Sequence, residues 1–355
     1  MSVLDREGRQ LGPDEVRFIE QLPKAELHIH LEGAVRPATL LELGRRHGIA
    51  YPFHDADAAR DWYRFRDFPH FIEIFIAVCD ALLTSEDIER ITYELGEDAH
   101  RQNIRYLEVI ISPTSILRPR TRANPDVYWA GVTAAASRVQ RDFGVIMRFH
   151  LDAVRTRLVE EVMAMARWAA ERLDEGLVGF NLGGTEAGYP ASLHQKAIAY
   201  AHDAGLGISL HAGETVGPES VWDALGAGAE RIGHGVTSIT DPALLEHLAR
   251  ERIVLEVSPS SNVCLGVVPS WPEHPIRRLA DAGVLVTLNS DDPPMFDTDL
   301  NQEYRRLAAI HGFSCRELAE LSLRAPRAAF LPAAEKQLLL DTFQAEIDRL
   351  LASLA

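Results

Sequence analysis

Apolar residues gather in eight short runs, separated by longer stretches of mixed polar and apolar character. Most of these runs are continuous rather than alternating, as expected for parallel strands buried on both faces. We expect strands over residues 24–31, 104–113, 145–154, 176–184, 206–214, 231–235, 252–261 and 284–293. Helical patterns fill the stretches between them, so the chain predicts strands and helices in alternation.

Local signals mark where some of the intervening helices begin. Ser85 is expected to cap a helix in which apolar residues such as Ile88, Ile91 and Leu95 recur at helical spacing. A proline in the first turn opens another helix after Gly217. Eight strands alternating with helices favour an α/β fold of the closed (β/α)8 TIM-barrel type over an open doubly wound sheet.

Two stretches stand outside this alternation. Residues 34–103 form a helical insertion after the first strand, which we expect over the barrel mouth, where substrate enters. Its aromatic residues between 62 and 75 are interpreted either as a lid or as the core of an inserted pair of helices. Residues 314–355 are expected to complete the outer helical layer. We therefore predict a single barrel domain over residues 1–355.

Composition narrows the class of protein. Hydrophobic residues make up 46% of the 355 residues, and 52 acidic against 36 basic residues give a formal net charge of −16. There is no long basic stripe, so we expect no binding to nucleic acid. No apolar run reaches the roughly 20 residues of a membrane-spanning helix, so we expect no membrane partner. A small molecule is the expected ligand.

The cysteines indicate the compartment. Cys79, Cys264 and Cys315 are far apart, odd in number and without CxxC spacing, which argues against a disulfide framework or a zinc ribbon. The N-terminal segment lacks the apolar region of a secretory signal. We therefore expect a cytoplasmic protein. The sequence carries no signal for an oligomeric state.

The first predicted strand ends in His28-Ile29-His30. Side chains two residues apart point to the same face of a strand, so these two imidazoles form half of a divalent metal site. His211, His234 and Asp291 also fall at the ends of predicted strands. In a barrel these ends converge on the face that carries the active site.

A catalytic zinc site needs neutral imidazoles and a carboxylate, with one position left for a water whose pKa the ion lowers toward 7. Four residues can supply the ligands of one ion: His28, His30, His211 and Asp291. Three others remain for acid–base work: His234, Glu214 and Asp292.

The fourth predicted strand argues for one metal rather than two. It ends in Gly183-Gly184 and contains no lysine that could bridge a second ion. Glycine lets the backbone approach a ligand closely, so the amide of Gly184 is a candidate donor to a flat ring. The alternative interpretation is a tight strand-to-loop turn.

These motifs together resemble the adenosine deaminase family of metal-dependent barrel hydrolases. The shared motifs, in the family's order over nearly the whole chain, are His-x-His-Leu-Glu-Gly at 28–33, Gly-Gly-x-Glu at 183–186, His-Ala-Gly-Glu at 211–214, Ile-Gly-His-Gly at 232–235, Ser-Pro-x-Ser-Asn at 258–262 and Ser-Asp-Asp-Pro at 290–293. The resemblance implies hydrolytic deamination of a 6-aminopurine nucleoside by one zinc ion per chain.

The resemblance also implies a role for each matching residue. His28, His30, His211 and Asp291 resemble the zinc ligands. His234 resembles the group that orients the attacking hydroxide and takes its proton, and Glu214 the proton donor to ring nitrogen N1. Three residues resemble substrate contacts: Asp292 to N7, the backbone of Gly184 to N3, and Glu32 to the ribose hydroxyl.

Departures from the family pattern bear on the substrate. Glu32 stands where adenosine deaminases usually carry Asp, and Thr185 departs from their Ala-Gly-Asp-Glu motif. This looks more like the branch acting on aminodeoxyfutalosine, an adenosine-like intermediate of menaquinone synthesis that carries an aryl carboxylate. Thr215 and Gly233 replace the acidic residues usual in adenine deaminases, which makes free adenine less suitable.

Alternatives remain open at this stage. Adenosine and aminodeoxyfutalosine are both candidate substrates, and a carboxylate on the latter calls for a cation such as Arg66, Arg118 or Arg120. An adenine deaminase, or another mononuclear zinc amidohydrolase acting on a cyclic amide or ester, is the alternative enzyme. A barrel that only binds a partner is the non-enzymatic alternative.

Overall fold

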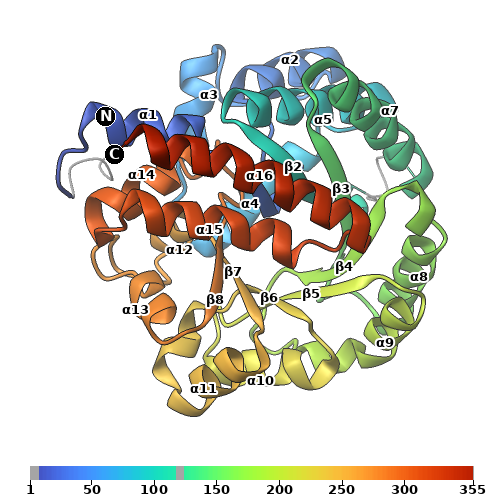
Figure 1. Ribbon diagram of the computed structural model, residues 1–355. Coiled ribbons are helices and arrows are strands. Elements are labelled where there is room, and N and C mark those ends of the chain that lie inside the picture. Colours follow the sequence, from blue (N-terminus) through green and yellow to red (C-terminus); the bar gives the residue numbers. More distant parts are fainter. Residues whose placement is uncertain (1–7, 117–123, 355) are drawn as a thin grey trace.

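The computed structural model describes residues 8–116 and 124–354, which form a ring of strands enclosed by helices (Figure 1). Eight parallel strands follow one another in chain order. They are β1 (Lys24–His30), β2 (Ile104–Ile111), β3 (Ile146–Val154), β4 (Leu177–Gly183), β5 (Gly207–Ala212), β6 (Arg231–His234), β7 (Val254–Val257) and β8 (Leu285–Leu288). A bridge between Ile29 and Asp291 joins β1 to the segment after β8. The predicted (β/α)8 barrel is confirmed.

The last two strands are shorter than predicted, whereas the first six end within two residues of the expected positions. After β7, Ser258 leads into α12 (Pro259–Cys264), because a proline at the first helical position starts a helix and cannot donate to a strand ladder. After β8, the backbone of Asp291 turns to a φ of 65°, outside the range of an extended strand.

The outer layer follows the predicted alternation. Its helices are α5 (Ser85–Arg101), α7 (Pro125–Phe143), α8 (Val159–Ala170), α9 (Gln195–Asp203), α10 (Pro218–Ala227), α11 (Pro242–Glu251), α13 (Ile276–Asp281) and α14 (Leu300–His311). The N-cap of α5 is Thr84 rather than the predicted Ser85. Thr84 Oγ1 accepts from the Asp87 amide while the Asp87 carboxylate accepts from the Thr84 amide, a reciprocal capping box.

The segment after β1 contains three short helices before α5: α2 (Pro37–His47), α3 (Ala56–Trp62) and α4 (Phe68–Cys79). Its aromatic residues divide into two groups. Trp62 packs with Tyr51 and Phe53, so this part forms a small core of its own. Phe71 instead stacks on Phe296, from the loop after β8. The first half of this aromatic segment therefore forms a core of its own, as one interpretation expects, whereas the second half packs against a loop that follows a strand end.

The N-terminal end of the barrel is covered by the last two helices, α15 (Cys315–Ala328) and α16 (Ala333–Ser353), which cross in front of the strands in Figure 1. Helix α15 contacts both β8 and β1. Helix α16 is tied to the start of β2 and β3 by ion pairs Arg105–Glu346 at 3.6 Å and Arg148–Glu335 at 3.0 Å. Two further short helices are α1 (Pro13–Gln21) and α6 (Pro113–Ile116).

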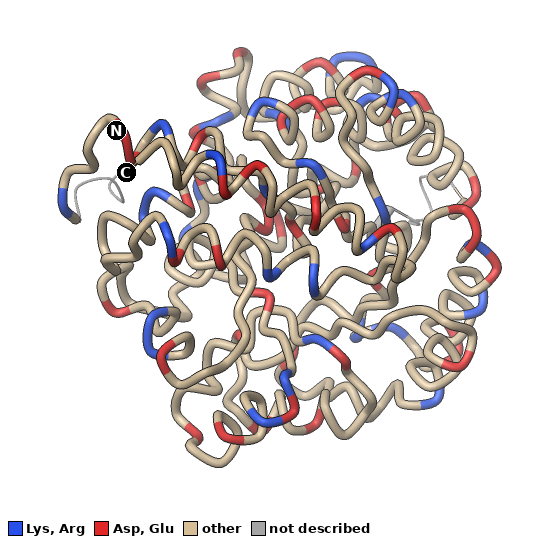
Figure 2. The backbone as a smooth tube through the Cα atoms, viewed as in Figure 1, with Lys and Arg blue, Asp and Glu red and all other residues tan. Residues whose placement is uncertain are grey.

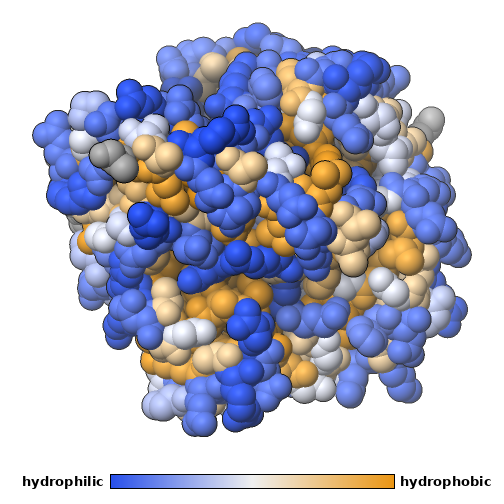
Figure 3. All heavy atoms as spheres, viewed as in Figure 1, coloured by the Kyte–Doolittle hydropathy of each residue, from blue (hydrophilic) through white to orange (hydrophobic). Residues whose placement is uncertain are grey.

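The surface carries charges of both signs. Figure 2 shows Lys and Arg interspersed with Asp and Glu along the outer helices. The face in Figure 3 is mostly hydrophilic, and apolar residues occupy separate areas between the helices. Among the helices of the described residues, none combines the length and the hydropathy that a membrane span requires.

A chain of buried charges crosses the barrel interior. Arg231 lies between two carboxylates, with its Nη2 2.5 Å from Glu108 Oε2 and its Nε 2.6 Å from Glu256 Oε1. His150 Nε2 lies 2.8 Å from the same Glu108 oxygen. Burial alone raises the pKa of Glu256, but Arg231 and then His28 outweigh it and bring that pKa to about 2. Glu256 therefore stays ionised in the barrel interior only because Arg231 and His28 lie beside it.

We predict that Arg231→Met destabilises the barrel by about 3–5 kcal/mol, because it leaves two buried carboxylates without a cation. The matched control is Arg250→Met, which removes a cation that pairs with Glu251 on the surface and is expected to cost under about 1 kcal/mol. Urea unfolding monitored by circular dichroism measures both. Equal shifts of the unfolding midpoint in the two variants would contradict the role of the buried pair.

Candidate metal centre and active site

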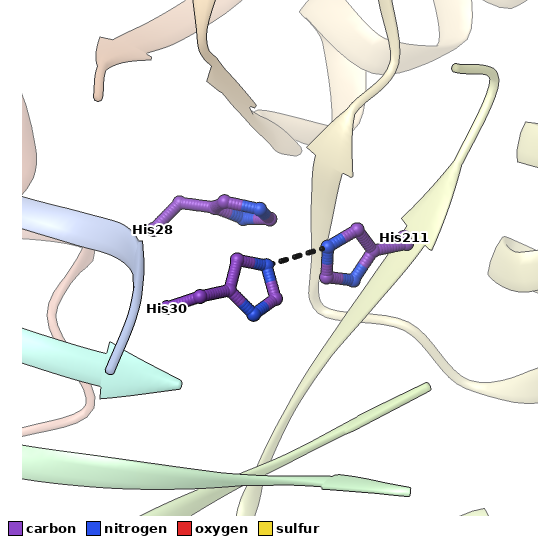
Figure 4. A group of neighbouring side chains, drawn as sticks. All are labelled: His28, His30 and His211. Carbon is purple, nitrogen blue, oxygen red and sulfur yellow. Dashed lines mark hydrogen bonds between the residues drawn. The ribbon is translucent and has the colours of Figure 1, made fainter. Parts of the chain in front are cut away.

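The C-terminal strand ends bring the predicted metal ligands together. His28 and His30 lie at the end of β1 and His211 lies in β5, and their rings face one another (Figure 4). His30 Nε2 is 3.3 Å from His211 Nε2. Asp291 Oδ1 is 3.5 Å from His28 Nε2 and 3.3 Å from His30 Nε2. Four residues separated by up to 263 positions along the chain therefore meet at one point.

Hydrogen bonds behind two of these rings leave their metal-facing nitrogens available. His28 Nδ1 lies 2.9 Å from Glu256 Oε2, and His211 Nδ1 lies 2.8 Å from Asn181 Oδ1. Donation from Nδ1–H to these oxygens leaves the lone pair on Nε2. His28 Nε2 is buried without a hydrogen-bond partner among the described residues. A buried nitrogen of this kind needs a partner, and a divalent cation supplies one.

The donor chemistry fits zinc. The atoms of His28, His30 and His211 lie within 4.8 Å of one another, as do those of His28, His234 and Asp291. Three imidazole nitrogens and one carboxylate oxygen form a set that zinc accepts readily. Because the two groups overlap, His234 is either a further ligand or a neighbour of the ion.

His234 is held in a neutral form beside this cluster. Burial lowers its pKa to about 3. The side chain of Asn262 lies between two rings, 3.3 Å from His234 Nδ1 and 3.2 Å from His274 Nε2, and so orients the His234 ring. The His234 backbone has a φ of 63°, a conformation that is uncommon outside glycine and often found at active sites. A neutral, oriented imidazole can accept a proton.

Glu214 follows β5 on a loop that Glu186 holds in place. The Glu186 carboxylate accepts from the backbone amides of Glu214 at 3.1 Å and Val216 at 3.3 Å. Burial, followed by the charges of Asp291 and Glu186, raises the pKa of Glu214 to about 8. Its Oε1 lies 3.7 Å from His234 Nε2. A half-buried carboxyl that keeps its proton at neutral pH is suited to act as a general acid.

Asp292 lies beside Asp291 and lines the same cavity. Burial, followed by the charge of Asp291, raises the pKa of Asp292 well above its ordinary range, so this carboxyl can donate a hydrogen bond. Its Oδ1 has no partner among the described residues. A Cβ on Gly33 would lie 1.5 Å from that oxygen, so glycine is required there. Gly184, at a φ of 87°, also lines the cavity.

Glu32 is placed differently from the other predicted substrate contacts. It is fully buried, and its Oε1 accepts from the Ser112 amide at 2.9 Å and the Tyr128 hydroxyl at 2.7 Å. Ser112 and Asp152 line the cavity, whereas Glu32 is not among the lining residues. Contact of Glu32 with a ribose hydroxyl therefore stays a prediction.

The cavity in front of the histidine cluster has a volume of about 460 Å³, within the range of small-molecule sites. The inner wall holds the polar groups, including His30, His211, His234, Glu214, Asp291 and Asp292. Helix α4 supplies an apolar wall. The insertion thus contributes directly to the site, and whether α4 moves as a lid stays a prediction.

The arginines proposed from sequence do not account for a cation in this cavity. Arg66 is exposed and is not among the lining residues, whereas Arg118 and Arg120 lie outside the described residues. Arg157, three residues after β3, does line the cavity. Its position just past a strand end is the signal that could have identified it, since such loops form the active-site face of a barrel.

Sequence reasoning also missed the residues that orient the predicted ligands. Asn181 and Glu256 lie inside strands β4 and β7, where a buried polar residue is the only signal of a partner. Glu186 and Asn262 belong to motifs that the chain shares with the family, but the sequence alone assigns neither residue a role. Their functions emerge only once the packing shows which backbone amide or ring each one contacts.

Comparison with known proteins agrees with this geometry. A family model described as adenosine deaminase matches residues 23–346. An aminodeoxyfutalosine deaminase from Streptomyces avermitilis is 42% identical over 342 residues, covering 95% of each chain. An adenine deaminase from Rhizobium leguminosarum is 38% identical over 320 residues, covering 90% of this chain and 98% of the relative.

Solved structures give the same family of folds. A zinc-bound amidohydrolase from Burkholderia ambifaria superposes with a TM-score of 0.90 at 27% identity, covering 98% of this chain and 97% of the other. An adenine deaminase from Arthrobacter aurescens superposes with a TM-score of 0.87 at 28% identity, covering 92% and 99%.

We predict that Glu256→Gln weakens zinc binding by about 10- to 100-fold, because the oxygen that orients His28 loses its charge. Competition with a chromogenic zinc chelator measures the affinity of the folded variant. The matched control is Glu303→Gln, a buried carboxylate that instead accepts from the Ser260 amide. An unchanged zinc affinity in Glu256→Gln, or an equal loss in both variants, would contradict the orienting role.

Proposed function

Because the chain belongs to the adenosine deaminase family, and is thus a deaminase that hydrolyses C–N bonds, we propose that it removes the 6-amino group of a purine nucleoside at a single zinc centre. The observation that carries this proposal is that three histidines and one aspartate meet beside a cavity that Glu214 lines, a carboxyl whose pKa is raised to about 8. The nucleoside becomes the 6-oxo product, and ammonia is released.

His28, His30, His211 and Asp291 would hold the ion. When bound, zinc supplies a Lewis acid that makes a water molecule acidic near neutral pH. Glu256 and Asn181 keep His28 and His211 turned toward the centre. The proposal assigns one ion per chain, because β4 offers no lysine to bridge a second.

The residues around the centre divide the proton transfers between them. His234 is neutral and accepts the proton of the attacking water. Glu214 carries a proton at neutral pH and donates it to N1, which makes C6 electrophilic. The water oxygen adds at C6 as a hydroxyl group. His234 then passes the proton it accepted to the departing amino group, and the hydroxyl proton returns to Glu214 as the C6–N6 bond breaks. Ammonia and the 6-oxo product result, and no redox partner is needed.

The purine ring is oriented by two groups at the edge of the centre. The raised pKa of Asp292 lets its carboxyl donate to N7. The Gly184 amide can donate to N3, because a glycine at positive φ exposes the backbone to a ligand. Together with Glu214 at N1 these contacts address three ring nitrogens, which distinguishes a purine from a cyclic amide or ester.

Aminodeoxyfutalosine is the substrate that we favour over adenosine. Two relatives with this name are 42% identical, compared with 37–38% for the adenine deaminases. A cavity of about 460 Å³ would be poorly filled by free adenine. The exposed Thr215 stands where adenine deaminases usually carry acidic residues. Adenine is nevertheless the second candidate, because adenine deaminases match over 90% of the chain. A cytoplasmic location stays a prediction.

We predict that Glu214→Gln lowers kcat by about 10²- to 10⁴-fold, because an amide cannot donate the proton that N1 requires. The zinc content of the purified variant should equal that of the parent enzyme. Steady-state kinetics and metal analysis on the same preparation measure both quantities. Glu246→Gln, an exposed carboxylate on α11, is the control, and near-normal kcat in the Glu214 variant would contradict the assigned role.

A substrate panel tests the proposed reaction. We expect the highest kcat/KM with aminodeoxyfutalosine, a lower value with adenosine and the lowest with adenine. Each turnover should release one ammonia and shift the ultraviolet absorbance of the purine. A preference for adenine would replace the nucleoside proposal, and turnover of a cyclic amide without ammonia from a purine would replace the deamination itself.

A further inference from the structure

The outer part of the cavity has an apolar wall. One face of α4 turns toward it through residues spaced three or four positions apart, namely Phe68, Phe71, Ile72, Phe75 and Ile76. The Phe75 ring lies edge-on to His30, with ring centroids 6.3 Å apart. The apolar wall therefore begins beside the predicted ligand His30 and continues outward to the half-exposed Phe68. Such a surface suits a flat aromatic group.

The path from the floor of the cavity to its rim follows β3 and the turn after it, in which the Arg157 amide donates to the Val154 carbonyl at 3.0 Å. Asp152 is buried, Val154 is half-buried and Thr156 is exposed, and all three line the cavity. The increase in exposure along these three residues marks increasing distance from the floor. Arg157 comes next, at the exposed rim.

Arg157 is distinguished by its charge. Within residues 8–116 and 124–354, it is the one Lys or Arg that lines this cavity. Its Nη2 donates to the Thr114 carbonyl at 3.3 Å, which holds the guanidinium against α6, and α6 contacts α4. A guanidinium has five N–H donors, so this single bond leaves donors for a ligand. The cation thus lies at the same side of the cavity as the apolar wall.

The purine occupies the inner part of the cavity in the proposed reaction, against Glu214 and Asp292. A carboxylate carried by the same substrate must then lie farther out, where Arg157 supplies a permanent cation. Arg binds carboxylates through two parallel N–H donors, a geometry that lysine lacks.

We infer that Arg157 is the specificity-determining residue that binds the carboxylate of the substrate's aryl group, while the α4 face packs against the aryl ring. This inference rests on the proposed deamination and deepens it, because it names the group that would distinguish aminodeoxyfutalosine from adenosine. Arg157 takes no part in the chemistry at C6. It contributes to substrate binding, and therefore to KM.

The experiment compares Arg157→Gln with the parent enzyme on three substrates: aminodeoxyfutalosine, its neutral methyl ester and adenosine. We expect KM for the carboxylate substrate to rise roughly 10- to 100-fold, as for loss of a charged hydrogen-bonded pair, with little change in kcat. The ester and adenosine should give the same constants with both enzymes. Arg157→Lys should recover part of the loss, because it restores the charge without the paired donors.

Arg66→Gln is the matched control, since Arg66 is exposed near the start of α4 but does not line the cavity. A rise in KM for all three substrates, or for none, would overturn the inference. Equal activity of the parent enzyme on the acid and its ester would overturn it while leaving deamination intact. Failure of the parent enzyme on every nucleoside would overturn the proposed function and this inference together.

Discussion

Closure of the barrel between its first and last strands is the constraint on which the site depends. The His30 amide donates to the Asp291 carbonyl at 2.9 Å, and the Asp291 amide donates to the His28 carbonyl at 3.2 Å. These two backbone bonds hold the aspartate beside the pair of histidines from the opposite end of the chain. The proximity of Asp291 to His28 and His30 is therefore a direct consequence of strand pairing, because the backbone fixes the positions of all three residues.

Side chains reinforce the same junction. Asn289 Oδ1 accepts from the amides of Leu27 and His28, and Glu26 Oε1 accepts from both the amide and the hydroxyl of Ser290 at 2.6 Å. Each such bond contributes about 1 kcal/mol net, but leaving one of these buried groups without a partner costs more. Ser290, which has no catalytic role here, thus belongs to the framework that positions Asp291. The backbone of Asp291 can accordingly hold its uncommon positive φ.

A second level of organisation lies behind the predicted ligands. Glu256 connects His28 to Arg231, and Arg231 connects Glu256 to Glu108. A buried charge is tolerated only when a partner of opposite sign is close, so this chain makes the orientation of one ligand depend on residues deep in the barrel. We therefore expect stability and metal binding to be coupled through it. The proposed recognition of the aryl group, in contrast, would depend on a loop and on α4, which lie outside this interior.

The sequence predicted the barrel, and it predicted residues that the structure brings together as a candidate metal site, because local patterns carry both signals. Continuous apolar runs reveal buried parallel strands, and polar residues at their ends reveal the active-site face. Glu256 and Asn181 could not be predicted as ligand partners, since a polar residue inside a strand does not show which ring it will face. The predicted lengths of β7 and β8 are too great. Pro259 and the left-handed backbone of Asp291 interrupt apolar runs whose composition is still typical of a strand. Arg157 was missed because its one signal is its position just after a strand end, which does not show that the side chain lines the cavity.

X-ray absorption spectroscopy of the zinc-loaded protein, combined with metal analysis, tests the central claim most directly. We expect one zinc per chain, with a first shell of nitrogen and oxygen at about 2.0–2.2 Å and the multiple-scattering signature of three imidazoles. Loss of one imidazole from this shell in His211→Ala would tie the signal to the proposed ligand set. A shell with sulfur, a second metal at short distance, or a chain that binds no zinc after supplementation would contradict a single centre built from His28, His30, His211 and Asp291.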